Sequence, residues 1–103
     1  MKTLLIDDMR DIDANVVART FDEGIYALRN NSKFDVLYLD HDLGEDGFVT
    51  IEGELYPKTG YGIMVFLENN QHLLPVKISL VTSNPVGRRN MQVVINKLYG
   101  VRS

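Results

Sequence analysis

The sequence predicts an α/β domain built on a four-stranded, mainly parallel sheet in the strand order 2-1-3-4. Three aliphatic runs have the length of buried strands, and stretches with helical spacing of apolar residues alternate with them. A β-branched run that begins at Val16 supplies an edge strand. Because strands and helices alternate along the chain, we expect a parallel sheet covered by helices on both faces.

The length and composition indicate one ordinary globular domain spanning residues 1–103. Apolar residues make up 45% of the chain and charged residues 24%, and the net charge of −3 argues against extended DNA binding or a membrane partner. The absence of cysteine excludes a disulfide framework, a zinc-thiolate site and a thiol nucleophile. No apolar run has membrane-spanning length and no signal peptide is evident, so we expect a soluble cytoplasmic protein.

The first half of the chain supplies two strands and a helix. Thr3–Ile6 is the first buried strand, and the polar residues 8–15 link it to the edge strand Val16–Thr20. Phe21–Asn30 follows as a helix with one apolar face. A parallel crossover usually takes roughly a dozen residues or more, so this short link is the point at which the predicted topology is most easily tested.

The second half alternates two strands with two helices. Residues 44–58, between the first strand and the first helix of this half, are an acidic, glycine-containing loop, which we expect to be mobile and to contain a small hairpin around Phe48–Leu55. The remaining predicted elements are a strand at Phe34–Leu39, a helix at Gly60–Asn69, a strand at Val76–Val81 and a helix from Pro85 to the residue before Gly100.

Acidic residues follow two of the three buried strands. Asp7 and Asp8 come after the first, and Asp40, His41 and Asp42 come after Phe34–Leu39. The carboxyl ends of parallel strands meet at one edge of a sheet, where α/β proteins bind ligands. Clustered carboxylates repel one another unless a cation intervenes, and oxygen ligands suit Mg²⁺. The plainer alternative is that these aspartates only begin turns or cap helices.

The third buried strand ends in groups that suit a phosphate. The candidates are hydroxyl, amide and guanidinium side chains at the start of the last helix, namely Thr82, Ser83, Asn84, Arg88 and Arg89. A helix N-terminus also favours an anion. "TSNP" is equally a competent helix cap, and arginines at such positions are often ordinary surface residues.

Four segments resemble the blocks of response-regulator receiver domains, in order "LLIDD", "FDVLYLD", "TGYGIMVFL" and "ISLVTSNP". The resemblance implies that Asp7 and Asp8 bind magnesium, that Asp40 is the phosphoryl acceptor and that Thr82 contacts the phosphoryl oxygens. The chain departs from that family where the first helix, the fifth strand with its lysine, and the last helix are expected. We therefore do not expect ordinary two-component signalling.

A narrower resemblance covers these departures. "LDHDLG", the following "TGY" and "TSNPVGRRNM" are similar to the small cyclic-phosphate-processing receiver-like family of bacteria and phages. This resemblance implies a minimal receiver-like (flavodoxin-like) sandwich, truncated after the helix that follows the fourth strand. It also implies action on cyclic nucleotides or on cyclic phosphate ends of RNA.

The leading functional hypothesis is a metal-dependent phosphoesterase acting on a cyclic nucleotide or an RNA 2′,3′-cyclic phosphate end. Mg²⁺ or Mn²⁺ would be held by Asp7, Asp8 and Asp40, and His41 or Asp42 would act as acid or base beside Asp40. The partner would be a small phosphorylated ligand, a nucleotide or an RNA end. One alternative is a non-catalytic nucleotide- or phosphate-binding module, and another is a degenerate phosphoreceiver with Asp40 as the acceptor. The sequence leaves open the oligomeric state and whether residues 44–58 form a lid.

Overall fold

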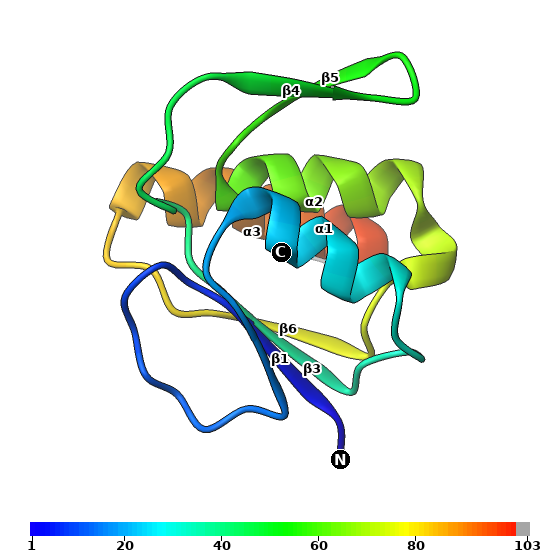
Figure 1. Cartoon of the computed structure of the whole chain (residues 1–103). Coiled ribbons are helices and arrows are strands. Elements are labelled where there is room, and N and C mark those ends of the chain that lie inside the picture. Colours follow the sequence, from blue (N-terminus) through cyan, green and yellow to red (C-terminus); the bar gives the residue numbers. More distant parts are fainter. Residues whose placement is uncertain (101–103) are drawn as a thin grey trace.

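The computed structural model describes residues 1–100, so the last three residues of the predicted domain lie outside this range. Its central sheet has four strands, all parallel, in the order β2-β1-β3-β6 (Figure 1). The strands are β1 (Thr3–Ile6), β2 (Val16–Ala18), β3 (Val36–Leu39) and β6 (Lys77–Leu80). This arrangement confirms the predicted 2-1-3-4 topology, including the parallel edge strand.

The short link from β1 to β2 is an irregular loop, residues 7–15, rather than a helix. At its far end, the Asn15 side chain accepts a hydrogen bond from the Thr3 backbone N–H at 2.8 Å, and the Asn15 N–H donates to Thr3 Oγ1 at 3.0 Å. At its near end, the Asp7 N–H donates to the carbonyl of Ala18 at 3.1 Å. Both ends of the loop are thus tied to the sheet, which allows a parallel crossover of this length without a helix.

Three α-helices follow the predicted boundaries closely. They are α1 (Phe21–Arg29), α2 (Gly60–Asn69) and α3 (Pro85–Tyr99), and a 3₁₀ turn, η1 (Gln71–Leu73), follows α2. The side chains of Thr20, Thr59 and Asn84 cap the three helices, and Gly100 ends α3 with a φ of 68°. Within residues 1–100, no helix combines the length and apolar character that crossing a membrane requires.

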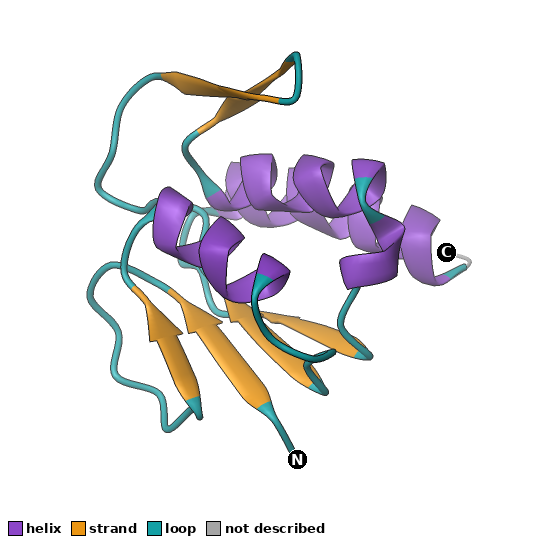
Figure 2. Cartoon of the chain, turned by 45° about the vertical axis from the view of Figure 1, so that its right-hand side comes forward, coloured by secondary structure: helices purple, strands orange, loops and turns teal. Residues whose placement is uncertain are grey.

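All three α-helices lie on the same face of the sheet (Figure 2). The expectation of helices on both faces was therefore wrong, and the direction of the crossovers explains why. The steps from β2 to β3 and from β3 to β6 run the same way across the sheet, so right-handed crossovers place α1 and α2 on one face. Only the step from β1 to β2 runs the other way, and a loop without a helix makes it.

The hydrophobic core lies between the sheet and these helices. Leu4 and Ile6 of β1 belong to it together with Phe21, Phe66 and Met91 from the helices, and all five are fully buried. Side chains alternate along a strand, so Leu5 points to the opposite face, where its register partners are Val17 and Tyr38. Leu5 is nevertheless fully buried.

Residues 48–57 form a separate antiparallel hairpin, as the sequence predicted. It consists of β4 (Phe48–Ile51) and β5 (Glu54–Pro57), and it lies beyond α2 on the side away from the sheet (Figures 1 and 2). Tyr56 anchors it: the ring meets Phe66 edge-on at 5.9 Å, and the hydroxyl accepts a hydrogen bond from Asn69 at 2.9 Å. The mobility expected for residues 44–58 stays a prediction.

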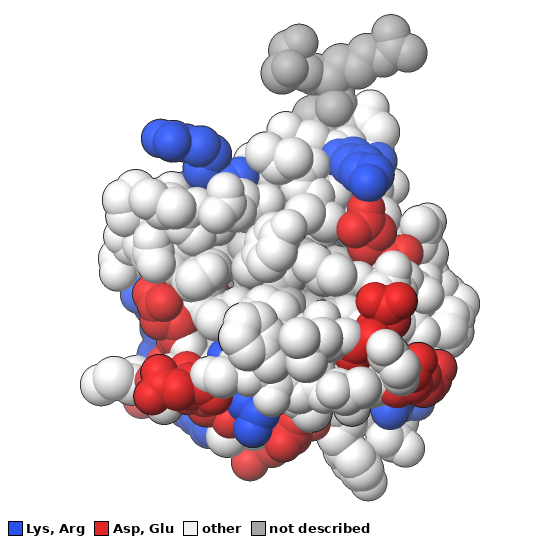
Figure 3. All heavy atoms as spheres, turned by 90° about the horizontal axis from the view of Figure 1, so that it is seen from above, with Lys and Arg blue, Asp and Glu red and all other residues white. Residues whose placement is uncertain are grey.

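Seen from the hairpin side, charged side chains lie mostly around the rim of the molecule (Figure 3). Acidic and basic groups alternate there in small clusters, and much of the centre of this face is uncharged. The face carries no broad basic surface among the described residues, in keeping with the net charge of −3.

Candidate metal and phosphate site

Three carboxylates meet at the carboxyl ends of β1 and β3. Asp7 and Asp8 follow β1, Asp40 follows β3, and one oxygen from each lies within 4.8 Å of the others. The parallel pairing of Ile6 with Leu39 brings them together, and the Asp40 N–H continues the ladder by donating to the Ile6 carbonyl at 3.0 Å. The sheet register therefore delivers the acidic cluster that the sequence predicted at this edge.

Asp7 is the buried member of the cluster, with 1% of its surface exposed. Its Oδ1 accepts hydrogen bonds from the backbone N–H groups of Met9 and Arg10, both at 3.0 Å. Its Oδ2 is buried without a hydrogen-bond partner among residues 1–100, and Nη1 of Arg10 lies 3.6 Å away. A buried carboxylate oxygen left unpaired is costly, and a hard cation would satisfy it. The donor set therefore fits Mg²⁺ or Mn²⁺.

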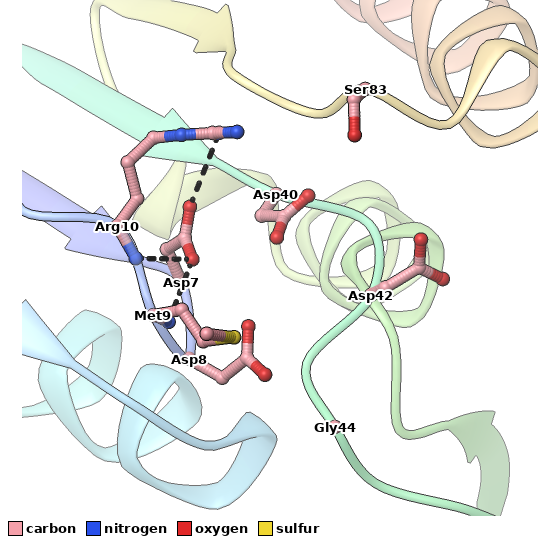
Figure 4. A pocket seen from close by; sticks show the side chains of 8 residues that line it. All are labelled: Asp7, Asp8, Met9, Arg10, Asp40, Asp42, Gly44 and Ser83. Atoms are coloured by element: carbon pink, nitrogen blue, oxygen red, sulfur yellow. Dashed lines mark hydrogen bonds and ion pairs between the residues drawn. The ribbon is translucent and has the colours of Figure 1, made fainter.

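The cluster lines an open pocket of about 410 Å³ (Figure 4). This volume is in the range of sites for small molecules. The lining residues are Asp7, Asp8, Met9, Arg10, Asp40, Asp42, Gly44 and Ser83. From the segment 44–58 the lining includes Gly44, at its start, while the hairpin itself lies over α2.

Asp40 sits at the centre of this edge, and its backbone and side chain are both engaged. Its Oδ1 accepts a hydrogen bond from the His41 N–H at 2.8 Å. Partial burial raises the pKa of the Asp40 carboxyl, the Thr82 hydroxyl opposes that rise, and the negative charge of Asp7 adds to it. The environment of Asp40 thus disfavours its ionised form, and a nearby cation would reverse that preference.

His41 and Asp42 form a hydrogen-bonded pair beside the acidic cluster. His41 Nδ1 lies 3.0 Å from Asp42 Oδ1, and Asn84 donates to Asp42 Oδ2 at 3.2 Å. These hydrogen bonds, that from His41 first, lower the pKa of Asp42. Because an ionised carboxylate only accepts, Nδ1 carries the proton in this pair. Asp42 lines the pocket, whereas His41 packs against the start of α3 at Gly87.

The "TSN" segment after β6 serves as a helix cap and as part of the site. Thr82 is 4% exposed, and its Oγ1 accepts a hydrogen bond from the Asn84 N–H at 3.1 Å. Asn84 caps α3 by accepting from the Gly87 N–H at 3.0 Å. Ser83 faces the pocket (Figure 4). The capping interpretation is confirmed for Asn84, and the phosphate-binding interpretation of the segment stays a prediction.

Arg88 and Arg89 lie outside the acidic pocket. Nη2 of Arg88 donates to the Thr82 carbonyl at 2.8 Å and to the Leu80 carbonyl at 3.5 Å. Its guanidinium thus binds carbonyl groups at and just after the end of β6. Both arginines line a different hollow along α3, together with Pro85 and Gln92. The structure therefore does not bring them to the carboxylates, although the sequence predicted both as phosphate ligands.

One charged residue of the pocket lining, Arg10, was missed by the sequence analysis. Arg10 extends from the loop after β1 across the acidic edge, where Nη1 donates to the Val81 carbonyl at the end of β6 (Figure 4). It lies in a polar stretch with no periodic pattern, and nothing in that stretch indicates where a side chain points. The sequence offered one weak signal: Arg10 lies three residues after Asp7 in the same link between β1 and β2, which places it near the acidic cluster.

Two glycines allow the helices that flank the site to approach it closely. The Gly60 N–H donates to the His41 carbonyl at 2.8 Å, and a Cβ on Gly60 would lie 2.1 Å from the Asp40 carbonyl oxygen. A Cβ on Gly87 would lie 2.4 Å from the His41 ring. The first glycine thus permits contact with the strand backbone, and the second leaves room for the imidazole.

A parallel 2-1-3-4 sheet, with acids after its first and third strands and a hydroxyl after its fourth, defines a receiver-like α/β domain. Comparison with protein families agrees and is more specific. Residues 2–97 match the family described as the cyclic-phosphate processing receiver domain, and the chain belongs to this family. Searches of the curated proteins and of the solved structures gave no match.

Proposed function

We propose that this domain is a metal-dependent phosphoesterase that opens a cyclic phosphate, either a cyclic nucleotide or a 2′,3′-cyclic phosphate at an RNA end. The observation that carries the proposal is the acidic triad: Asp7, Asp8 and Asp40 each offer a carboxylate oxygen within 4.8 Å of the others, and Oδ2 of Asp7 is buried without a hydrogen-bond partner in the described residues. The family description supplies the cyclic phosphate as the substrate class.

Asp7, Asp8 and Asp40 are the residues that would hold the cation. A bound Mg²⁺ or Mn²⁺ supplies Lewis-acid polarisation of the phosphoryl group and lowers the pKa of a bound water. The contribution of the protein is to hold three carboxyl groups close together at one edge of the sheet. The sheet register and the two backbone hydrogen bonds to Asp7 Oδ1 preorganise these carboxyl groups for a cation.

Asp42 is the pocket residue placed to handle the attacking water. His41 and Asn84 hold it as a carboxylate, so it accepts a hydrogen bond from the water and takes its proton as the water oxygen bonds to phosphorus. One ester P–O bond breaks, and the released oxygen takes up a proton to give a phosphate monoester. His41 is not part of the pocket lining but forms a hydrogen bond with Asp42, so we assign His41 a positioning role. Its predicted role as the acid or base stays a prediction.

Ser83 is placed to donate its hydroxyl to a phosphoryl oxygen, because it lines the pocket beside Asp40 and Asp42. Thr82, which the sequence also predicted as a phosphate ligand, is buried and lies close enough to Asp40 to affect its pKa. We assign Thr82 to orienting Asp40 and Ser83 to direct contact with phosphate.

The direct test is to incubate the protein with Mg²⁺ and, separately, with 2′,3′-cyclic mononucleotides, 3′,5′-cyclic nucleotides and acetyl phosphate. We expect a phosphate monoester from one of the two cyclic classes, lost on chelation of the metal and reduced about 10²-fold or more in Asp42→Asn. Asp40→Asn removes a metal ligand with little change in side-chain volume and should abolish the activity that depends on Mg²⁺. Product that forms equally well with a chelator would refute the proposal.

The same experiment separates the two other functions. A cyclic nucleotide that binds and is recovered unchanged identifies a binding module. A phosphoryl group added to the protein by acetyl phosphate, and absent from Asp40→Asn, identifies a phosphoreceiver. The receiver alternative draws on the position of Asp40 at the pocket, next to Asp7 and Asp8.

A further inference from the structure

We propose that Arg10, carried by the loop between β1 and β2, is the guanidinium that binds the phosphoryl group in the acidic pocket. The inference rests on the proposed function, since it concerns the ligand of the same site. It assigns the phosphate-binding cation to an irregular loop at the acidic side of the pocket, and not to the arginines at the start of α3.

The position of Arg10 is the first argument. Its side chain lines the pocket with Asp7, Asp8 and Asp40 (Figure 4). Its guanidinium donates to the Val81 carbonyl, directly after β6. It is also 40% exposed, so a ligand in the pocket has access to it. Asp7, Asp8, Asp40 and Asp42 put four negative charges around this pocket, and Arg10 is the cation that its lining contributes.

The second argument is the unused hydrogen-bonding capacity of Arg10. Both of its contacts, with the Val81 carbonyl and with Asp7 Oδ2 at 3.6 Å, use Nη1. Nε and Nη2 have no hydrogen-bond partner in the described part of the chain. A guanidinium offers five N–H donors in a planar fork that matches phosphate in a bidentate manner. Arg10 therefore retains the donors that a phosphoryl group would need.

The third argument is that Asp7 holds Arg10 only loosely. A separation of 3.6 Å is too long for a good hydrogen bond, and Asp7 Oδ2 remains unpaired. A cation bound to Asp7 would compete for that same oxygen and weaken its pull on the guanidinium. Arg10 would then be free to turn toward an anion, so phosphate binding should depend on the metal.

The arginines at the start of α3 are engaged differently. Arg88 uses Nη2 for the carbonyls of Leu80 and Thr82, and Arg89 lies with it along a hollow separate from the acidic pocket. Arg89 is therefore a matched control: it is an arginine on the same molecule, exposed, and outside the lining of the site.

Arg19 is the positioning residue for this loop. Its Nη1 donates to the carbonyls of Asp7 at 3.1 Å and Arg10 at 2.7 Å, and its Nη2 pairs with Asp11 at 2.9 Å. Three contacts from one guanidinium thus hold the loop that carries Arg10. Arg19 would therefore affect phosphate binding through the position of Arg10.

The test uses binding, not turnover, and takes the metal first. Mg²⁺ binding is measured by calorimetry, and inorganic phosphate is then titrated into the Mg²⁺-saturated protein. In Arg10→Met we expect Mg²⁺ affinity to be unchanged or tighter, because a competing cation is gone, and phosphate affinity to fall about tenfold or more. Arg89→Met should leave both unchanged. Arg10→Lys should recover only part of the loss, because an ammonium lacks the fork.

The outcomes separate this inference from the proposed function. If the wild-type protein binds no Mg²⁺, the proposed function fails. If it binds Mg²⁺ and phosphate, and Arg10→Met binds phosphate as tightly as wild type, the assignment of Arg10 alone is overturned. Equal losses in Arg10→Met and Arg89→Met would also overturn it, because that result indicates a general effect of charge.

A double-mutant cycle tests the role of Arg19. Arg19→Met should weaken phosphate binding in the wild-type background and have little further effect in the Arg10→Met background, because both changes remove the same contact. Additive losses in the two backgrounds would show that Arg19 does not act through Arg10. Circular dichroism and Mg²⁺ affinity check that the variants remain folded.

Discussion

At the start of α2, Gly60 lies against the backbone of Asp40 and His41, whereas at the start of α3, Gly87 lies against the imidazole ring of His41. The α2 contact includes a backbone hydrogen bond of 2.8 Å, from Gly60 to the His41 carbonyl. The α3 contacts are made by side chains: Asn84 donates to Asp42, and the His41 ring packs on Gly87.

This difference indicates which side of the site is fixed and which can adjust. The sheet register fixes the backbone at the end of β3, so α2 meets Asp40 at a fixed position. Side chains can change rotamer at modest cost, so the His41–Asp42 pair can shift relative to α3. The side proposed to bind metal is therefore tied to the fold, and the side proposed to activate water is held by side-chain contacts.

The largest effect is expected from Gly60→Ala. The added Cβ would meet the Asp40 carbonyl oxygen at 2.1 Å, and all three atoms nearest to it belong to the backbone, which cannot yield by a change of rotamer. We expect a loss of about 3 kcal/mol or more in the free energy of unfolding, measured by urea denaturation. Tyr61→Ala, at the next and more exposed position of α2, should cost about 1 kcal/mol or less. Similar losses in both variants would show that the close approach at Gly60 is not rigid.

The next effect concerns the metal side and uses Asp40→Asn. Mg²⁺ at about one hundred times its dissociation constant should stabilise the wild-type protein by about 2.7 kcal/mol and the variant by much less. Without metal, the variant should be as stable as wild type or more so, because it relieves repulsion among Asp7, Asp8 and Asp40. Thermal melting of both proteins with and without Mg²⁺ measures this. Equal stabilisation of both by Mg²⁺ would place the cation elsewhere.

Gly87→Ala should have a smaller effect that depends on His41. The new Cβ would force the His41 ring to move, which should cost about 1–2 kcal/mol and loosen the hydrogen bond to Asp42. In a His41→Gly background the His41 ring and its Cβ are both absent, so the clash disappears, and alanine at position 87 should then stabilise α3 by up to about 1 kcal/mol over glycine. A double-mutant cycle on unfolding free energies reveals this change of sign. A cost that is the same in both backgrounds would mean that the ring does not occupy this space.

The fold was predictable from the sequence where hydrophobic runs and helix caps determine it. The strand at β3, the boundaries of α2 and the cap at Asn84 follow from local patterns, and the parallel sheet then brings Asp7 and Asp40 together. One-sided helix cover was not predicted, because it depends on the direction of each crossover and not on any one segment.

The parts of the site that sequence analysis missed depend on contacts between distant or irregular segments. Arg10 lies in a loop without periodicity, so its reach to Val81 has no local signature. Arg88 has a guanidinium group that suits a phosphate ligand, but this group donates to the Thr82 carbonyl after β6 instead. Glu45 belongs to the acidic segment 44–58, and its carboxylate accepts a hydrogen bond from the Phe21 N–H at 2.7 Å at the start of α1, a contact with no local signature in the sequence.

The smallest effect is expected at the far end of α3, where Tyr99 anchors the helix whose start contacts the site only through side chains. The Tyr99 hydroxyl donates to the Pro75 carbonyl at 2.5 Å, and burial raises the pKa of Tyr99 from 10.0 to about 12. In the folded protein this tyrosine keeps its proton at pH values where the unfolded chain has lost it. Its contribution to stability is therefore complete below pH 10 and is lost as the pH rises toward 12. Tyr99→Phe should be slightly less stable than wild type at pH 8, by about 1 kcal/mol for the lost hydrogen bond, and the gap should close between pH 10 and 12. The measurement is the difference between the unfolding free energies of the two proteins across this range. Other groups that titrate in both proteins cancel in this difference. A gap that stays constant or widens with pH would show that Tyr99 does not anchor α3 through its protonated hydroxyl.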